Sequence, residues 1–182
     1  MTPANGPETF DRTPLFRTRT PAGDDRERQQ CGHCGFIDYQ NPKIVTGVVA
    51  TWEDKILLCK RAIEPRKGYW TLPAGYMELG ESVEDGAARE AWEEARAKLT
   101  IDQVLAIYSI PRISQVQILY RARLTTPQVS AGPESEAVAL YDWADIPWAD
   151  LAFPTVGWAL RHYAETKDQA QFVPFSNPAD GL

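Results

Sequence analysis

The pattern of apolar and polar residues through the middle of the chain predicts strands that alternate with two helices. Two apolar runs flank the polar turn at 53–55, which predicts a hairpin of two strands over 43–61. A short strand is expected near 69–73. Further strands are predicted over 99–110, 114–124 and 137–143, and a closing helix over 154–168. Strands that alternate with helices in this way are typical of an α/β sandwich.

The first helix is expected to begin near Ser82, at a glycine-rich segment. Ser82 and Asp85, three residues apart, resemble a capping box, and glycines at 75, 80 and 86 interrupt the chain around it. One stripe of this helix consists of small or β-branched residues and is expected to pack closely against a sheet. The residues of this stripe are Val83, Ala87, Ala88, Ala91 and Ala95.

Three glutamates lie beside that stripe. At roughly 100° per residue, Glu93 and Glu94 fall on either side of Glu90, so three carboxylates share one face of the helix. A glutamate-rich helix is most often a solvated surface. Here the capped start and the glycine loop favour a built site, in which three neighbouring anions require a cation. Hard divalent ions such as Mg²⁺ take oxygen ligands and bridge to phosphates, so the pattern indicates a metal-dependent enzyme that acts on phosphates.

The segment from Gly75 to Ala97 carries the spacing G-x5-E-x7-R-E-x-x-E-E and resembles the Nudix box. The run from Tyr39 to Ser82 is similar to Nudix hydrolases that carry a zinc ribbon before the catalytic domain, and the similarity covers roughly residues 23–163. The resemblance implies an α/β/α sandwich with a mixed sheet between helices. It also implies attack of a metal-activated water on the pyrophosphate of a nucleoside diphosphate linked to a moiety X. The products would be a nucleoside monophosphate and phosphorylated X.

The resemblance also implies roles for the residues of the box. The implied ligands of Mg²⁺, with Mn²⁺ as the alternative ion, are Glu90, Glu93, Glu94 and the backbone carbonyl of Gly75. Glu81 and Arg89 would form a supporting pair. A charge-assisted contact between a glutamate in the loop and an arginine on the helix would fix the loop and orient the metal ligands.

The general base stays open at the level of sequence. Glu94 is the first choice because it lies in the box, and Glu134 and Glu136, after the fourth predicted strand, are the alternatives. Arg61 and Arg66 precede the box and are expected to contact phosphate or ribose oxygens, since a guanidinium makes bidentate contacts. Glu136 is a further candidate for contact with the substrate.

The expected substrate is an ADP-containing diphosphate that yields AMP, because the similar subgroup includes enzymes of ADP-ribose and of FAD. The pattern SQPWPFPxS of NADH-cleaving relatives is missing, since Val116 and Gln117 follow Ser114 and Gln115. A Nudix-fold nucleotide sensor that has lost hydrolysis is the alternative, although such modules usually have a damaged box. An RNA-end hydrolase is disfavoured by the acidic charge. A homodimer is compatible with the resemblance, since many relatives dimerise.

Two positions depart from the family pattern. Arg96 stands where the box usually has Gly, and because Gly commonly ends a helix, we expect the helix to continue for about one more turn. Cys31 and Cys34 form one zinc knuckle, but relatives have a second upstream pair that this sequence lacks. Structural zinc needs four ligands, and His33 would supply only a third, while Cys59 is expected in a distant strand. We therefore expect a ribbon remnant without zinc.

Length and composition fit one enzyme domain with short extensions. The chain has 182 residues and a formal net charge of −6, which disfavours duplex nucleic acid and leaves a small nucleotide as the expected partner. No apolar run reaches the roughly 20 residues that span a bilayer, and three cysteines do not suggest a disulfide framework, so a cytoplasmic protein is expected. We divide the chain into a poorly ordered leader (1–30), a ribbon remnant (31–43), the hydrolase domain (44–170) and a C-terminal tail (171–182).

Overall fold

The computed structural model describes residues 15–179, and the chain divides into two compact units, residues 1–41 and 42–182. In the described part of the first unit, three short strands form an antiparallel sheet in the order β1-β2-β3. They are β1 (Phe16–Arg19), β2 (Arg28–Cys31) and β3 (Ile37–Asp38). This differs from the predicted poorly ordered leader over 1–30, of which residues 1–14 lie outside the description.

Polar contacts hold the strands of the first unit together. Arg28 Nε donates a hydrogen bond to Asp24 Oδ2 at 2.9 Å, and the Arg28 guanidinium lies 5.3 Å from the centre of the Tyr39 ring. Across the β1–β2 pair, Gln29 Nε2 donates to Thr18 Oγ1 at 2.8 Å. The prediction of disorder relied on the scarcity of large apolar residues, and that criterion does not register stabilisation by backbone and side-chain hydrogen bonds.

The second unit is built on a mixed sheet with one parallel pair at its centre. In this sheet β4 (Lys43–Trp52) runs parallel to β9 (Gln115–Leu124), and the other strand pairs are antiparallel. The order is β10-β5-β4-β9-β8, with β6 paired to β5 and β7 paired to β4. The remaining strands are β5 (Lys55–Arg61), β6 (Trp70–Thr71), β7 (Ala74–Tyr76), β8 (Leu99–Ile110) and β10 (Ser135–Tyr141).

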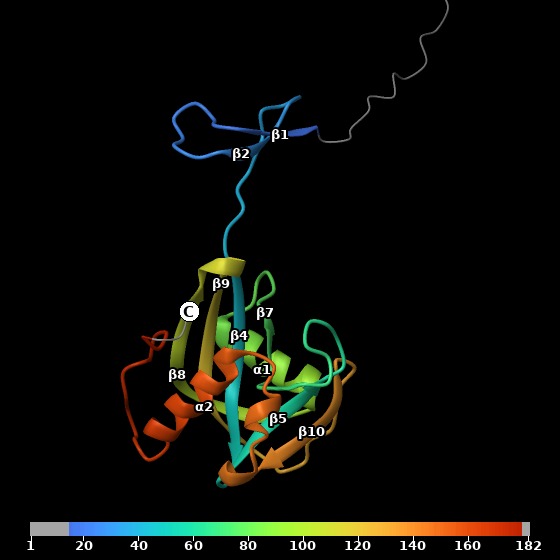
Figure 1. Ribbon diagram of the computed structural model, residues 1–182, viewed down its shortest axis with the longest axis vertical. Coiled ribbons are helices and arrows are strands. Elements are labelled where there is room, and N and C mark those ends of the chain that lie inside the picture. Colours follow the sequence, from blue (N-terminus) through green and yellow to red (C-terminus); the bar gives the residue numbers. More distant parts are fainter. Residues whose placement is uncertain (1–14, 180–182) are drawn as a thin grey trace, which may run out of the picture. The chain divides into compact units, whose positions relative to one another are not determined.

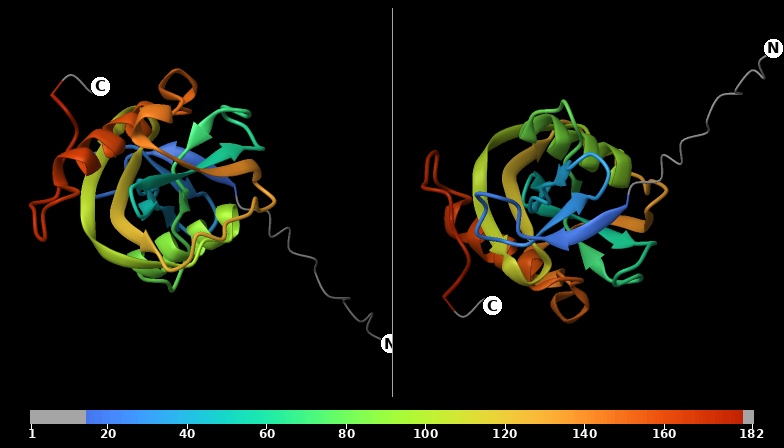
Figure 2. Two further views of the ribbon diagram at one scale, coloured as in Figure 1. Left: turned by 90° about the horizontal axis from the view of Figure 1, so that it is seen from below. Right: turned by 90° about the horizontal axis from the view of Figure 1, so that it is seen from above.

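Two helices, α1 (Val83–Ala95) and α2 (Pro154–Thr166), cover opposite faces of this sheet (Figure 1, Figure 2). Val49 of β4 belongs to the core cluster that includes Leu160 of α2, whereas its neighbour Val48 belongs to the cluster that includes Ala91 of α1. Successive residues of a strand point to opposite faces, so two cores lie on either side of the sheet. The fold is therefore an α/β/α sandwich, as the sequence predicted.

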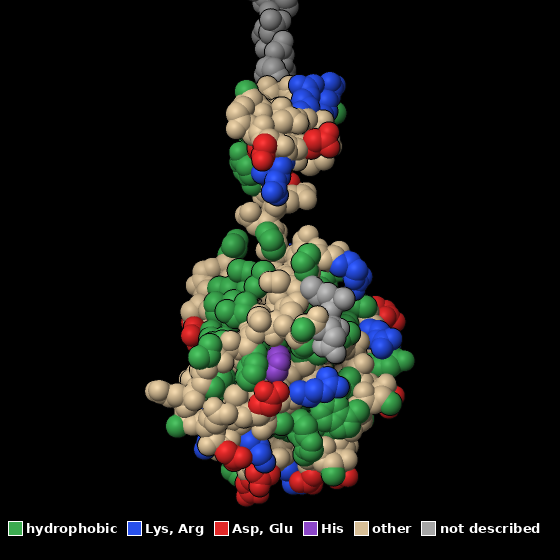
Figure 3. Space-filling model, turned by 60° about the vertical axis from the view of Figure 1, so that its left-hand side comes forward, with side chains coloured by type: hydrophobic (Ala, Val, Ile, Leu, Met, Phe, Trp, Pro, Cys, Tyr) green, Lys and Arg blue, Asp and Glu red, His purple; other side chains and the backbone are tan. Residues whose placement is uncertain are grey.

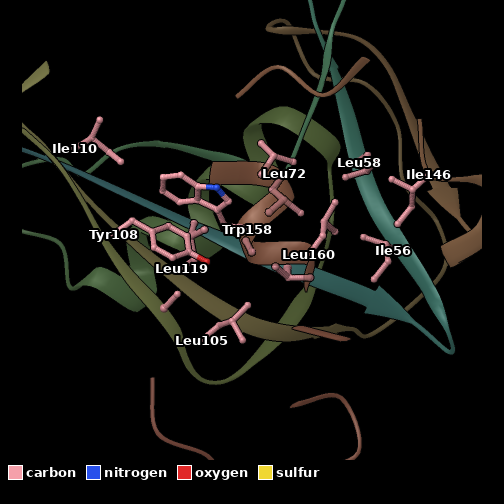
Figure 4. Packing of buried hydrophobic residues seen from close by; sticks show 14 residues of the cluster. Ile56, Leu58, Leu72, Leu105, Tyr108, Ile110, Leu119, Ile146, Trp158 and Leu160 are labelled. Carbon is pink, nitrogen blue, oxygen red and sulfur yellow. The ribbon is translucent and has the colours of Figure 1, made fainter. Parts of the chain in front are cut away.

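The core beneath α2 is made of large side chains (Figure 4). Tyr108 from β8 meets Trp158 from α2 edge to face, with ring centres 5.4 Å apart. Three short 3₁₀ helices complete the second unit. They are η1 (Pro111–Ile113), η2 (Trp143–Asp145) and η3 (Trp148–Asp150).

The chain after α2 returns along β8, which is the last strand in the sheet order. Phe175 N–H donates to the carbonyl of Leu105, and Ile107 N–H donates to the carbonyl of Phe175, both at 2.9 Å. The Phe175 ring also stacks on His162 of α2, with ring centres 4.0 Å apart. Part of the predicted C-terminal tail thus pairs with the edge of the sheet, a position where unpaired backbone groups would otherwise be exposed.

The predicted start of α1 is confirmed, whereas its predicted end is wrong. Ser82 caps the start, since its hydroxyl accepts from Asp85 N–H at 3.1 Å. The expected extra turn at the other end is wrong: the helix ends at Ala95, and Arg96 adopts the left-handed conformation with φ 51°. A tertiary hydrogen bond explains this end. Ser130 N–H donates to the Ala95 carbonyl at 2.9 Å, and a longer helix would need that carbonyl as the acceptor for its own next turn.

Charged side chains of both signs are interspersed with hydrophobic ones on the face drawn in Figure 3, without a continuous basic patch. Within residues 15–179, no helix is long and apolar enough to cross a membrane.

Candidate functional site

The close approach of α1 to β4 depends on Gly86 in the first turn of the helix. A Cβ atom at Gly86 would lie 2.8 Å from Thr46 Cγ2 and 2.7 Å from Glu81 Oε1. Thr46 Oγ1 in turn donates to the carbonyl of Val83 at 2.9 Å. A larger residue at position 86 would push the helix away from both the strand and the preceding loop, so this glycine fixes where the acidic face lies.

Glu90 lies against the backbone of β7, where a side chain is missing. A Cβ atom at Gly75 would come within 2.4 Å of the Glu90 carboxylate. Glu90 is 9% exposed, and burial raises its pKa above the usual range although Arg89 opposes the shift. Gly75 therefore lies next to the helix, and the Glu90 carboxylate packs directly against the glycine backbone.

Glu94, one turn further along α1, is the more deeply buried of the two carboxylates. It is 6% exposed, and its Oε2 accepts a hydrogen bond from Ala74 N–H at 3.2 Å. Burial raises the pKa of Glu94 to about 8. Glu93 lies at the rim, with 53% of its side chain exposed. The three glutamates thus share the predicted face, but their surroundings differ.

Arg89 connects the loop before α1 to the acidic face. Its Nε and Nη2 donate to the two carboxylate oxygens of Glu81 at 3.0 and 2.8 Å, and Nη2 also donates to the carbonyl of Tyr76 at 3.0 Å. This bidentate contact lowers the pKa of Glu81 to about 2. Arg89 Nη1 donates to Glu90 and Glu93 at 2.8 and 3.0 Å. The predicted Glu81–Arg89 pair is present and reaches two further carboxylates.

The donor atoms of this face fit a hard divalent cation, because all of them are oxygens and two belong to buried carboxylates. Among the described residues, no group of three acidic, histidine or cysteine side chains is arranged to hold an ion as it stands. The contacts of Arg89 Nη1 account for part of this, since the guanidinium occupies oxygens of Glu90 and Glu93. These two carboxylates would exchange contacts with Arg89 for contacts with an ion.

The segment between β9 and β10 comes directly against the end of α1. A Cβ atom at Gly132 would lie 1.7 Å from the carbonyl oxygen of Glu93, and Gly132 N–H donates to the carbonyl of Glu94 at 3.0 Å. Glu134, two residues on, is near enough that its charge raises the pKa of both Glu90 and Glu94. The structure therefore brings Glu134 to the acidic face.

Glu136 is placed differently. Its Oε2 lies 3.9 Å from Lys60 Nζ, and both side chains are more than one third exposed. The strand pairing shifts register between Ser135 and Ala137, opposite Arg61 and Lys60 of β5. Of the two alternative bases, Glu134 follows the loop that Gly132 holds against α1, and its charge raises the pKa of Glu90 and Glu94, whereas Glu136 pairs with Lys60 of β5.

Arg61 and Arg66 lie at the end of β5 and in the loop after it. Arg61 Nε donates to the carbonyl of Pro65 at 2.8 Å, and its charge opposes the rise in the pKa of Glu94. Arg66 Nε donates to the carbonyl of Ala152 at 3.0 Å. The charge of Arg61 therefore acts on the acidic face, whereas Arg66 is held by the backbone of Ala152.

Cys31 is the last residue of β2 in the first unit, and Cys34 lies in the turn that follows it. Cys31 is buried and Cys34 is exposed, and hydrogen bonds from the backbone N–H groups of Cys34 and His33 lower the pKa of the Cys31 thiol. Cys59 lies in β5 of the second unit, and burial raises the pKa of its thiol. The expectation of a ribbon remnant without zinc stays a prediction.

Sequence reasoning missed the residues whose importance comes from contacts between distant segments. Gly132 is one of them, and the dipeptide Gly132-Pro133 was the only local signal for a turn at this point. Phe153 is another, because its ring lies 5.3 Å from the Arg61 guanidinium, although the two residues are far apart in the chain. No local pattern announces such a contact.

Comparison with known proteins agrees with this geometry. The NUDIX domain family matches residues 41–164, and the Nudix N-terminal zinc-ribbon family matches residues 14–40. An ADP-ribose pyrophosphatase of Methanocaldococcus jannaschii is 30% identical over 119 residues, which cover 63% of this chain and 69% of that protein.

Two solved structures extend the comparison. A NUDIX hydrolase from Nitrosomonas europaea is 43% identical with a TM-score of 0.84, over 92% of this chain and 96% of that one. An ADP-ribose pyrophosphatase from Streptococcus suis is 25% identical with a TM-score of 0.62, over 75% of this chain and all (100%) of that one. Family matches, sequence identity and fold all agree. The chain therefore belongs to the Nudix family and is a Nudix pyrophosphohydrolase.

Proposed function

We propose that this enzyme hydrolyses, with Mg²⁺, the pyrophosphate bond of a nucleoside diphosphate linked to X, with ADP-ribose or FAD as the substrate and AMP and X-phosphate as products. The observation that carries the metal-dependent reaction is the pair of buried carboxylates, Glu90 and Glu94, held by α1 against the backbone of β7. The similarity to two proteins named as ADP-ribose pyrophosphatases supports an ADP-linked substrate.

Buried anions at this position are costly unless a cation compensates them. We assign the metal ligands to Glu90, Glu93, Glu94 and the carbonyl of Gly75, with Mn²⁺ as the alternative ion. When bound, the ion would supply neutralisation of the pyrophosphate charge and activation of the attacking water. Arg89 and Glu81 would fix the loop against the helix, because their bidentate contact joins the two segments.

For the general base, the geometry supports two of the three candidates. Glu94 is buried beside the backbone of Ala74, and Glu134 is exposed on the segment that Gly132 holds against α1. Glu134 lies outside the set of metal ligands that we assign, so its carboxylate is free to accept a proton from the attacking water; we therefore assign the base role to Glu134 and the ligand role to Glu94. Residues 44–170 would carry the whole reaction.

The test is AMP release from ADP-ribose, FAD, NADH and diadenosine polyphosphates, with Mg²⁺ and with Mn²⁺. We expect release from ADP-ribose or FAD by the wild-type protein, and loss of release in Glu94→Gln. If no substrate is cleaved with either ion while nucleotide still binds, and Glu94→Gln keeps that affinity, the protein is a sensor and the hydrolase proposal is wrong.

The base assignment predicts a contrast between two neighbouring glutamates. Glu134→Gln should lower kcat by roughly 10²-fold or more with little change in KM, since general base catalysis contributes on that scale. Glu136→Gln is the matched control and should leave kcat within about twofold, because its carboxylate pairs with Lys60. Steady-state kinetics with the cleaved substrate measures both. Equal losses in the two variants would contradict the assignment.

A further inference from the structure

The segment just before α2 supports the loop that carries the two arginines. Ala152 N–H donates to the carbonyl of Trp70 at 2.7 Å, and Leu151 forms a backbone bridge with Trp70. The carbonyl of Ala152 accepts from Arg66 Nε at 3.0 Å. Ala152 is buried, so residues 151–153, which we call the brace, form a fixed support for residues 62–69.

The brace also reaches Arg61 at the end of β5, through the side chain of Phe153. The Arg61 guanidinium lies 5.3 Å from the centre of the Phe153 ring, and Arg61 Nε donates to the carbonyl of Pro65 at 2.8 Å. Within residues 15–179, the two terminal nitrogens of this guanidinium make no hydrogen bond or ion pair, since only Nε donates. The side chain is thus held on two sides while its outer N–H groups stay available.

Arg61 lies between the two acidic segments of the candidate site. Its charge acts on Glu94 of α1, and Ala62 N–H, one residue on, donates to the carbonyl of Glu134 at 2.8 Å. A diphosphate bound at the acidic face through a cation would carry further unpaired oxygens. A guanidinium already fixed in place binds such oxygens at a lower entropic cost than a free one.

We propose that Phe153 is a positioning residue, whose ring holds the Arg61 guanidinium so that its terminal N–H groups face the diphosphate of the substrate. The proposal rests on the proposed function of the same site. It assigns a substrate-orienting role to the start of α2, a segment far in the chain from the box. Arg66 serves as a comparison, because the backbone of Ala152 and the ring of Tyr69, rather than the ring of Phe153, hold its guanidinium.

A double-mutant cycle between Phe153 and Arg61 tests this role. The variants are Phe153→Leu, Arg61→Ala and the double variant, with kcat and KM measured for the substrate that releases AMP. We expect Phe153→Leu to raise KM about two- to fivefold and to leave kcat within about twofold, the size of a lost cation–π contact. When Arg61 is already replaced by Ala, Phe153→Leu should not raise KM further. Phe153→Tyr keeps the ring and should restore the wild-type KM.

Three controls separate positioning from a general loss of structure. Phe172→Leu removes another ring beside a guanidinium, that of Arg121 at 4.7 Å, and should leave KM unchanged. When Phe153→Leu is combined with Arg66→Ala, the free-energy effects of the two substitutions on KM should add. Melting curves of all variants show whether each one is folded. Additive effects of Phe153→Leu and Arg61→Ala, or an equal rise in KM for Phe172→Leu, would overturn the proposal.

A binding measurement keeps the inference separate from the proposed hydrolysis. The same cycle is repeated by calorimetry with Mg²⁺ and α,β-methylene-ADP, a diphosphate that cannot be cleaved between its phosphates. A wild-type protein that binds this probe without cleaving any substrate would refute the proposed hydrolysis alone. Loss of affinity in Phe153→Leu that vanishes in the Arg61→Ala background would still support positioning, and unchanged affinity in Phe153→Leu would refute it.

Discussion

Single atoms decide the geometry of the acidic face at two glycines. At Gly75 a missing Cβ leaves room for the Glu90 carboxylate, and at Gly132 it lets a loop meet the carbonyl of Glu93. Neither requirement follows from turn geometry, since neither residue has a positive φ. Both come from close approach between segments, which is the second common reason why a position in a fold requires glycine.

Gly132→Ala should therefore destabilise the protein. The added Cβ would lie 1.7 Å from a backbone oxygen, which cannot move as a flexible side chain can. We expect a loss of about 1–3 kcal/mol in the free energy of unfolding, the usual cost of overpacking. Gly157→Ala in α2 is the control, because its nearest atom is 3.6 Å away, and Ala favours a helix interior. Urea denaturation of the two variants should give opposite signs, and equal stability of Gly132→Ala and wild type would contradict the close approach.

The lowered pKa of the buried His162 predicts how the stability of the protein depends on pH. Its Nδ1 lies 2.7 Å from the Tyr108 hydroxyl, and burial lowers the pKa of His162, although the charge of Glu165 opposes this. Burial also raises the pKa of Tyr108, so its hydroxyl stays protonated over this pH range. Because the unfolded state takes up the proton more readily, this stabilisation is present above about pH 6.5 and is lost as the pH falls toward the lowered pKa.

The measurement is the melting temperature between pH 7.5 and pH 5, compared with that of His162→Gln. Carboxylates that titrate elsewhere contribute equally to both proteins, so the difference between the two curves reports on the histidine. We expect the wild type to lose more stability on acidification than the variant. Parallel curves would show that protonation of His162 does not oppose folding.

At the scale of elements, the end of α1 shows what a local pattern cannot reveal. Arg96 is a good helix former, and the expected extra turn followed from that property alone. The structure ends the helix at Ala95, without the extra turn, and Ser130 and Gly132 donate to the carbonyls of Ala95 and Glu94. The hairpin turn at 53–55 was predictable, since it depends only on residues adjacent in the sequence.

Arg96→Gly should stabilise the protein. Residue 96 has φ 51°, a conformation that costs an L-residue about 1–2 kcal/mol, whereas Gly adopts it freely. Part of this gain is offset because Gly is also more flexible in the unfolded chain, so we expect a net gain of about 0.5–1 kcal/mol. Arg96→Ala is the control and should bring no gain, since Ala meets the same backbone strain. Chemical denaturation distinguishes the two, and a loss of stability in Arg96→Gly would show that the arginine side chain matters more than the backbone.

At the scale of the whole molecule, the sequence was sufficient for the sandwich and for the acidic face of α1. The period of apolar residues determines which side of each strand and helix is buried, and that information is local. It was insufficient to separate Glu134 from Glu136, because the pairing of Glu136 with Lys60 and the register shift between Ser135 and Ala137 arise from contacts between distant segments. It was also insufficient for the strands of the first unit, whose stability depends on polar contacts such as that of Arg28 with Asp24.

We assign the binding of the divalent ion that diphosphate hydrolysis requires to the acidic face of α1. The most direct test is a titration of the nucleotide-free protein with Mn²⁺, in which electron paramagnetic resonance measures the free ion, for wild type, Glu94→Gln and Glu136→Gln. We predict affinity weakened about tenfold or more in Glu94→Gln and unchanged affinity in Glu136→Gln. Equal Mn²⁺ affinity in all three proteins would contradict the assignment of the metal site to this face.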